Sequence, residues 1–364
     1  MADLALRNVR LTEGEGACDV IVRDGRIADI GPGLAAGDPG AETAGGALLC
    51  AGLVETHIHL DKACILDRCR LQEATLAEAV GETARAKPGF SEDDVDARAR
   101  RVLDAAIAQG TMRMRSFVEV DPRAGRRGFD ALCRLRDEYR PWIDLEICAF
   151  AQEGLTQEMA TWEMLDIACR DGADLVGGCP YTDPEPAAHI RLIFDLAERH
   201  DLPVDFHLDF HLDPDRSDLA VVLAETARRG WGGRVSIGHV TNLSALAPTQ
   251  LAEVAERLVA HGVALTVLPA TDLYLNGRES DRLVPRGVTP AHSMAGVVVT
   301  LATNNVLNPF TPFGDASLIR MAGLYANVVQ AGRDDDLTRI WAMITENGDR
   351  LLGRKPRRIE PGAP

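Results

Sequence analysis

Several features that mark membrane and secreted proteins are missing from this sequence of 364 residues. It contains no apolar run near the roughly 18 residues that a membrane-spanning helix requires. Its first ten residues, MADLALRNVR, do not have the form of a signal peptide. We therefore expect a protein without a membrane segment and without a cleaved leader.

Positive charge is scarce relative to negative charge. The chain has 39 Lys and Arg residues against 55 Asp and Glu residues, which gives a formal net charge of −16. An acidic chain is a poor ligand for nucleic acid or for an anionic membrane surface. We expect a small-molecule partner, no nucleic acid and no membrane; a homo-oligomer is compatible with this composition.

Paired cysteine spacing is absent as well. The eight cysteines lie scattered along the chain, at positions 18, 50, 64, 69, 133, 148, 169 and 179. Scattered cysteines in or beside expected strands are typical of reduced, packed thiols rather than of a disulfide framework. This pattern predicts a cytoplasmic protein.

Histidine is rare, with nine residues in the chain, yet two of them stand together in Val54-Glu55-Thr56-His57-Ile58-His59-Leu60-Asp61-Lys62. The preceding apolar run, residues 47–54, has the length and composition of a buried parallel strand. Residues i and i+2 of a strand point to the same face, so His57 and His59 should point together beyond the strand end. Two convergent imidazoles make half of a site for Zn, Fe or a similar ion.

Short apolar runs alternate with amphipathic stretches from residue 47 onward. The expected strands are 49–55, 112–120, 143–150, 174–179, 203–207, 234–238, 263–268 and 298–303. The expected helices are 74–87, 91–108, 125–138, 156–171, 185–200, 216–229, 247–261, 289–295, 315–331 and 335–352. Eight strand–helix units predict an α/β fold of the (β/α)8 TIM-barrel type, with a doubly wound sheet as the alternative. Polar residues at the ends of strands one, three, five, six and eight favour the barrel, in which those ends form one mouth.

The two ends of the chain lie outside the expected barrel. Residues 1–46 predict a small β unit and linker, with strands near 3–9, 17–23 and 26–30 and a hairpin at Asp24-Gly25. The barrel is expected over residues 47–352. Residues 353–364 end at a turn signal and predict a tail leading to a missing β strand, so we expect the gene product to be longer than this chain.

Two more histidines end predicted strands. His207 closes the fifth strand and His239 closes the sixth. A single histidine in a protein core is common, whereas four at the ends of three barrel strands are not. The sequence therefore predicts one polar centre at the barrel mouth.

The strand ends also carry a set of motifs in a fixed order. They are His57-x-His59-Leu60-Asp61, Phe150-Ala151-Gln152-Glu153-Gly154, Asp174-Leu175-Val176-Gly177-Gly178-Cys179-Pro180, His207-Leu208-Asp209, Gly238-His239, Leu275-Asn276-Gly277-Arg278, Pro285-Arg286-Gly287-Val288-Thr289 and Asn308-Pro309-Phe310-x-Pro312-Phe313-Gly314. In these motifs the sequence resembles the amidohydrolase superfamily, and within it the cytosine deaminase and N-isopropylammelide aminohydrolase branch. The resemblance covers nearly the whole chain.

The resemblance implies hydrolytic deamination of a small nitrogen heterocycle such as a cytosine, triazine or cyclic amidine. In such enzymes the HxH pair, the strand-five His and a strand-eight Asp hold one divalent ion, Zn or Fe. The strand-six His contacts the reactive water, and the strand-three Gln reads the amide edge of the ring. A Glu three residues after the strand-five His moves protons. The physical basis is general, since the metal lowers the pKa of water and a nearby base moves the protons.

Two positions depart from this pattern. Asn304 stands where the strand-eight Asp belongs, and Phe210 stands where the proton-moving Glu belongs. An amide can coordinate weakly but takes no proton, and a phenyl ring does neither. The polar residues that follow His207, namely Asp209, His211 and Asp213, are the expected replacements, because His211 can titrate near neutrality. A loop histidine on the rim is an equally good interpretation of His211.

These considerations give three sets of predicted site residues. The predicted metal ligands are His57, His59 and His207. The predicted substrate-binding residues are Lys62, Gln152, Asp61 and Phe210. The predicted catalytic residues are His239, His211, Asp209 and Asn304.

Three interpretations remain open at this point. The first is a metal-dependent hydrolase with an altered proton relay. The second is a metal-independent hydrolase or related enzyme on the same scaffold. The third is a non-catalytic relative that binds a ring compound. The joint presence of Lys62, Gln152 and all four histidines argues against the third.

Overall fold

The computed structural model describes residues 4–11, 16–282 and 284–364. Contacts divide the chain into two compact units, Leu53–Arg354 and Met1–Gly52 together with Lys355–Pro364. None of the helices in the described ranges combines the length and apolar composition that crossing a bilayer requires.

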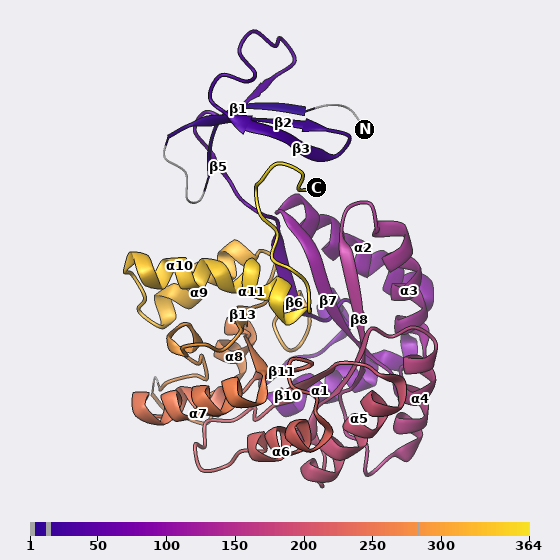
Figure 1. Ribbon diagram of the computed structural model, residues 1–364. Coiled ribbons are helices and arrows are strands. Elements are labelled where there is room, and N and C mark those ends of the chain that lie inside the picture. The colour runs from indigo at the N-terminus through magenta and orange to yellow at the C-terminus, as the bar shows by residue number, and fades with distance from the viewer. Residues whose placement is uncertain (1–3, 12–15, 283) are drawn as a thin grey trace. The chain divides into compact units, whose positions relative to one another are not determined.

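The larger unit is built on a sheet of eight parallel strands that pair in chain order (Figure 1). Within the described residues they are β6 (Leu53–Ile58), β7 (Thr111–Glu119), β8 (Asp144–Ala151), β9 (Leu175–Gly178), β10 (Val204–Leu208), β11 (Val235–His239), β12 (Val263–Val267) and β13 (Val299–Leu301). A bridge between Ile58 and Asn304 joins the first strand to the residues after the last. The predicted (β/α)8 barrel is confirmed, and because every strand runs the same way, all strand ends lie at one mouth.

Helices cover the outside of these strands, as Figure 1 shows for α2 to α7. The α-helices described are α1 (Leu76–Ala86), α2 (Glu92–Ala108), α3 (Arg127–Tyr139), α4 (Met159–Arg170), α5 (Pro186–His200), α6 (Leu219–Arg229), α7 (Pro248–His261), α8 (Pro269–Leu275), α9 (Leu318–Val328), α10 (Asp334–Met343) and α11 (Glu346–Leu351). The cap of α2 follows from sequence, since the Ser91 side chain accepts a hydrogen bond from the Asp94 backbone N–H. The helices pack on a continuous apolar core that contains residues from all eight strands.

Four elements differ from the sequence-based expectations. The helix expected at 335–352 is divided into α10 and α11. The apolar run at 47–54 is divided: Leu48–Leu49 forms β5, which pairs with β1 (Leu4–Leu11), and the barrel strand begins only at Leu53. The stretch 289–295 is not an α-helix. It contains one short 3₁₀ turn, Ala291–Ser293, and 3₁₀ helices are commonly this short. Helix α8 was not expected, and it begins directly after β12.

The smaller unit is a β sheet made from both ends of the chain. In it β1 pairs with β2 (Cys18–Arg23) and β2 with β3 (Arg26–Gly31), while β4 (Glu42–Thr43) lies beside β1. The predicted hairpin is present, since Asp24 and Gly25 both have positive φ, as a two-residue type I′ turn requires. The C-terminal tail also belongs to this unit, and the backbones of Gly362 and Ala363 exchange hydrogen bonds with Ile27. The expected strand at 3–9 starts on a residue outside the described ranges.

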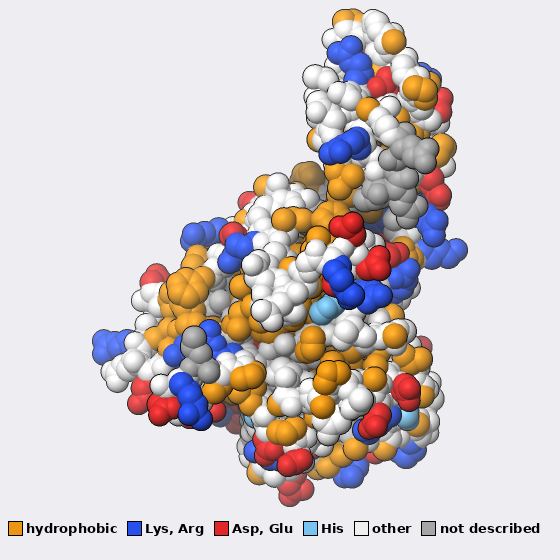
Figure 2. Space-filling view, turned by 90° about the vertical axis from the view of Figure 1, so that its left-hand side faces the viewer, with side chains coloured by type: hydrophobic (Ala, Val, Ile, Leu, Met, Phe, Trp, Pro, Cys, Tyr) orange, Lys and Arg blue, Asp and Glu red, His pale blue; other side chains and the backbone are white. Residues whose placement is uncertain are grey.

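All eight cysteines are free thiols. On the face drawn in Figure 2, acidic and basic side chains alternate in small groups among apolar ones, and no broad basic surface is visible among the described residues. The free thiols agree with the sequence-based expectation on cysteine chemistry.

Candidate functional site at the barrel mouth

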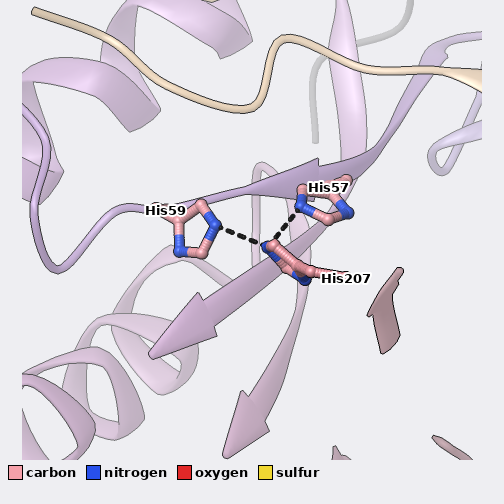
Figure 3. Close-up of side chains that lie close together, drawn as sticks. All are labelled: His57, His59 and His207. Atoms are coloured by element: carbon pink, nitrogen blue, oxygen red, sulfur yellow. Dashed lines mark hydrogen bonds between the residues drawn. The ribbon is translucent and has the colours of Figure 1, made fainter. Parts of the chain in front are cut away.

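Three histidines converge at the mouth of the barrel (Figure 3). His57 and His59 come from the end of β6, and His207 comes from β10 and lies between them. The Nε2 atom of His207 lies 3.0 Å from the Nε2 atom of His57 and 3.0 Å from that of His59. All three side chains are at most 2% exposed. The alternation of β6 and the parallel pairing of the barrel bring together the three ligands predicted from the sequence.

The chemistry of these three rings fits a divalent metal ion. Burial, together with neighbouring positive groups, lowers the pKa of each imidazole well below its usual value, so the rings are neutral and can offer lone pairs. The three Nδ1 atoms are buried without a hydrogen-bond partner, and one Nε2 atom cannot satisfy two neighbours at once. An ion between the Nε2 atoms would accept one lone pair from each, as in three-histidine catalytic sites.

Asn304 lies on the seam that closes the barrel. Its backbone N–H donates to the carbonyl of His57, and its carbonyl accepts from the backbone N–H of His59, both at 2.9 Å. Its φ of 62° is left-handed, and its side-chain oxygen is buried without a partner. A buried, unpaired amide oxygen beside two metal-ligand candidates is costly unless a cation or water satisfies it. The predicted placement of Asn304 next to the HxH pair is therefore consistent with the geometry.

His239, at the end of β11, completes the group of four histidines. Its ring centroid lies 5.3 Å from that of His207 and 5.8 Å from that of His57. Its Nδ1 atom lies 2.6 Å from Oδ1 of Asp272, which belongs to α8. Phe210 packs its ring against His239 at 81° and 4.8 Å between centroids. The Phe210 phenyl ring thus forms an apolar wall beside His239.

A second polar group lies beside the histidines and contains Lys62 and Gln152. The Lys62 ammonium donates to Oε1 of Gln152 at 2.9 Å and to Oε1 of Glu119 at 2.7 Å. It also lies 4.4 Å from the centre of the Phe310 ring. The Gln152 amide nitrogen faces only the Cys179 sulfur, at 3.5 Å, which is a weak acceptor. The amide of Gln152 is thus held in place while its N–H groups lack a strong partner.

A buried cage of carboxylates supports this pair. Glu119, Asp121 and Glu153 lie close enough together to bind a cation, but the Lys87 ammonium already contacts all three. Glu119 lies between the Lys62 and Lys87 ammonium groups. Although burial alone would raise it, these two ammonium groups hold the pKa of Glu119 at about 2. The cage is a salt-bridge network rather than a second metal site.

Two carboxylates predicted for the site are turned toward the backbone. Asp61 accepts from the backbone N–H groups of Lys62 and Glu119, at 2.8 and 2.9 Å. Asp209 accepts from the Ser217 hydroxyl at 2.5 Å and from the Asp218 backbone N–H at 3.0 Å. Both side chains fix the strand ends, because buried carboxylates take the nearest unpaired donors. The structure gives neither of them a direct hydrogen bond to a histidine of the mouth.

His211 is set apart from the other histidines of the mouth. Its backbone carbonyl accepts from the Thr241 hydroxyl, and its Nδ1 atom is buried without a partner. Among the described residues, no ring contact or hydrogen bond joins its side chain to His239 or to the three-histidine group. The described hydrogen bonds of His211 are therefore made by its backbone rather than by its imidazole.

Several residues of the site were missed by sequence reasoning. Glu119 lies near the end of the expected strand 112–120 and is the last residue of β7, so its position at a strand end was an available signal. Glu55 lies two residues before His57 on the same face, accepts from the backbone N–H of His57 and from Thr303, and burial raises its pKa to about 7. Asp272 lies on a helix that was not expected, although Pro269 at its start is a helix signal. Lys87 gave no signal, because its partners are more than 30 residues away in sequence.

A cavity of about 850 Å³ lies near the loops after β12 and β13. Thr303 and Asn305, which flank Asn304, belong to its wall, and so do Arg278, Arg282 and Arg286. None of the described residues that line it is a histidine of the mouth. It therefore lies beside the four-histidine group rather than containing it.

Comparisons with known proteins agree on one family. The model of the amidohydrolase family matches residues 48–364. A pterin deaminase of Rhizobium rhizogenes is 26% identical and aligns with 97% of this chain and 82% of that protein. An N-isopropylammelide isopropyl amidohydrolase of Pseudomonas sp. is 25% identical, over 96% of this chain and 86% of that protein.

Solved structures show the same relationship. A 5-methylcytosine deaminase of Klebsiella pneumoniae superimposes with a TM-score of 0.90 and 28% identity, covering 96% of this chain and 86% of that chain. An N-isopropylammelide isopropylaminohydrolase of Burkholderia multivorans gives a TM-score of 0.85 and 28% identity, covering 100% of this chain and 90% of that chain. The family match spans the whole barrel and its four-histidine mouth, so this chain belongs to the amidohydrolase family and is a hydrolytic enzyme acting on C–N bonds.

Proposed function

We propose that this enzyme hydrolyses the exocyclic C–N bond of a small nitrogen heterocycle and releases ammonia or an amine. The observation that carries the proposal is the position of the Lys62–Gln152 pair next to the three-histidine centre. Phe150, two residues before Gln152 on β8, contacts the His207 ring at 4.2 Å between centroids. A ring bound by Gln152 would therefore lie over the histidines. Relatives named as deaminases of pterin and 5-methylcytosine support this substrate class.

Substrate recognition would use the amide of Gln152. A ring amide presents one donor and one acceptor side by side, and a glutamine amide offers the complementary pair. Lys62 determines the orientation of the Gln152 amide. An ammonium group can only donate, so the amide oxygen must face Lys62. The amide nitrogen then points its N–H groups at a carbonyl of the ring, replacing the weak contact with Cys179.

The three histidines would hold the metal. His57, His59 and His207 supply three neutral nitrogens, and the unpaired Asn304 oxygen is close by. A divalent ion held there supplies Lewis-acid chemistry, lowering the pKa of water and polarising the substrate. We propose zinc or iron, since imidazole ligands suit both.

The reaction itself exchanges nitrogen for oxygen at a ring carbon. The oxygen of water forms a bond to the carbon, the exocyclic C–N bond breaks, and the leaving nitrogen gains a proton as it departs. The proton comes from the water, so no other reactant is needed. His239 is the proposed proton acceptor, because Phe210 and Asn304 cannot take a proton. The proposed path does not use Asp209, which accepts from the Ser217 hydroxyl and the Asp218 backbone N–H, and it does not use His211.

The direct test is ammonia release from a panel of aminated rings. Purified protein would be loaded with zinc or with iron and offered amino-pyrimidines, amino-triazines and amino-pterins. We expect release of one ammonia or amine per ring from at least one class. Tight binding of a ring without any product would contradict the proposal and support a non-catalytic, ring-binding protein.

Gln152→Ala should weaken substrate binding. The substitution removes both hydrogen bonds to the ring and leaves the Lys62 ammonium with one acceptor fewer. Loss of such a partner costs about 1–3 kcal/mol, which corresponds to an increase in Kd of roughly 5- to 150-fold. Isothermal titration with a substrate analogue measures this change. Gln157→Ala, at the end of the same loop, is the matched control; equal affinities in all three proteins would exclude the ring-amide interpretation.

Asn304→Asp should tighten metal binding. It places an anion where the structure has an unpaired buried oxygen beside the HxH pair. Greater ligand charge raises cation affinity, and we expect a decrease in metal Kd of about tenfold or more. Competition with a chelator of known affinity measures it. An unchanged Kd would mean that the side chain of residue 304 does not face the metal; Asn327→Asp, on exposed α9, controls for overall charge.

A further inference from the structure

Among the carboxylates near the mouth, Asp272 differs from the rest. Asp61, Asp209, Glu55 and Glu119 are bonded to backbone N–H groups, hydroxyls or ammonium groups. Within the described residues, Asp272 is the carboxylate that hydrogen-bonds to the imidazole ring of a histidine of the mouth, through the 2.6 Å contact between its Oδ1 and Nδ1 of His239. Both groups are buried, with Asp272 fully inaccessible and His239 3% exposed.

The orientation of Asp272 is fixed on its other side. Its Oδ2 accepts from the backbone N–H of Leu268 at 3.1 Å, and its own N–H donates to the Leu268 carbonyl as the first turn of α8 forms. An ionised carboxylate has no hydrogen to donate, so both of its oxygens act as acceptors. An acceptor at Oδ1 requires that His239 carries its proton on Nδ1, which leaves the Nε2 lone pair free.

The backbone holds His239 in an unusual conformation. His239 and Val240 have φ values of 69° and 46°, and a β-branched residue such as valine rarely adopts positive φ. The strain is held by hydrogen bonds from the Val240 N–H to the Leu208 carbonyl and from the Thr289 hydroxyl to the Val240 carbonyl. Strain of this kind persists where the surrounding structure fixes a functional geometry. Here it places the imidazole between Asp272 and the other three histidines.

The other contacts of the His239 ring are with aromatic rings. Phe210 covers one side, and the His207 and His57 rings lie on another. The described residues provide no hydrogen-bond partner for its Nε2 atom. A lone pair directed into the site beside three convergent histidines is well placed to accept a proton from a reacting water.

We infer that Asp272 is a positioning residue that holds His239 in the Nδ1–H tautomer, so that Nε2 accepts the proton of the attacking water. This inference rests on the proposed function. The Asp272–His239 pair does the work that residues 210 and 304, as Phe and Asn, cannot do. As Nε2 takes the proton, the imidazole becomes cationic and the Asp272 carboxylate stabilises it. The same proton then passes to the leaving nitrogen, which restores neutral His239.

Asp272→Asn tests the inference because the Leu268 N–H determines how the amide must lie. The amide oxygen must accept from Leu268, which turns the NH₂ group toward His239. Nδ1 must then accept, and the ring proton moves to Nε2. The shape of the side chain is preserved, while the lone pair facing the site is lost.

The tautomer can be read directly by nuclear magnetic resonance. Protein carrying ¹⁵N only in its nine histidines would be measured in zinc-containing buffer, with His239 assigned by loss of its signals in His239→Gln. We expect Nδ1–H for His239 in the parent protein and Nε2–H in Asp272→Asn. His189 serves as an internal reference that should not change, because its Nδ1 pairs with Oδ2 of Asp183, at 3.1 Å, and not with Asp272.

Kinetics provide the second measurement. We expect kcat of Asp272→Asn to fall roughly 10²- to 10⁴-fold, the range of a general base, with KM changed less than about threefold. Nε2–H in the parent protein, or a kcat within about threefold of the parent, would overturn the inference. If Asp272→Asn does not fold, the parent spectrum alone decides. Nδ1–H without turnover of any ring would overturn the proposed function while supporting the role of Asp272 in positioning His239.

Discussion

Glu119→Gln should destabilise the barrel by about 3–5 kcal/mol, the cost of leaving a buried charge without its partner. Glu119 is 1% exposed and lies between two ammonium groups that are each 2% exposed. In the variant, the Lys87 ammonium still has the carboxylates of Asp121 and Glu153 as partners. The Lys62 ammonium has only the neutral oxygen of Gln152 as a hydrogen-bond acceptor. Urea unfolding followed by tryptophan fluorescence measures the loss, since all four tryptophans lie in the barrel unit.

The matched control is Glu153→Gln, which removes a more exposed carboxylate from the same lysine. Its cost should be smaller, about 1 kcal/mol or less, as for partly exposed ion pairs. The double variant Lys62→Met/Glu119→Gln removes the unpaired ammonium and should recover part of the loss. Equal costs for Glu119→Gln and Glu153→Gln, with no recovery in the double variant, would refute a charge-pairing role for Glu119.

The same carboxylate gives a pH dependence of stability. The ammonium groups of Lys62 and Lys87, opposing burial, hold the folded pKa of Glu119 at about 2, below the value of about 4.3 in an unfolded chain. Its contribution is therefore complete above pH ~4.3 and is lost as the pH falls from there toward 2. In Glu119→Gln this part of the acid transition should be absent.

His207→Ala should abolish metal binding and turnover. His207 is the ring that contacts both His57 and His59, so its removal leaves two nitrogens and an open cavity. Metal affinity should fall by more than about 100-fold. Loss of a residue that only hydrogen-bonds to a metal ligand costs about 10- to 100-fold, and loss of a ligand should cost more. Elemental analysis after metal loading and dialysis should give about one ion per chain in the parent and almost none in the variant, taking three imidazoles as a sufficient set.

His261→Ala is the control for His207→Ala, because His261 is half-buried at the end of α7 and its imidazole bonds to the Arg257 carbonyl of its own helix. It should keep both the metal and the activity. A parent protein that holds no ion even after loading, yet turns over a ring, would replace this mechanism with a metal-independent one. Retention of the metal by His207→Ala would show that the three rings are not its ligands.

The sequence by itself determined the barrel and the histidines at its mouth. Alternation within Glu55–His59 and the recurrence of apolar runs are local properties, and parallel strands bring their ends to one mouth whatever the details of packing. The HxH pair, His207 and His239 could therefore be placed together before any coordinates were known. The predicted start of the first barrel strand was wrong, because Leu48–Leu49 is as apolar as a barrel strand. Only its pairing with β1 assigns this segment to the smaller unit.

Only the tertiary structure decided which polar side chains face the site. Asp61 and Asp209 each lie two residues after a histidine in sequence, but their carboxylates accept hydrogen bonds from backbone N–H groups instead. Asp272 and Lys87 are 33 and 32 residues from His239 and Glu119, and they reach these partners across separate elements. Such pairs depend on distances between side chains of distant segments. Secondary-structure periodicity specifies the faces of each element, but it does not specify which donors and acceptors meet across them.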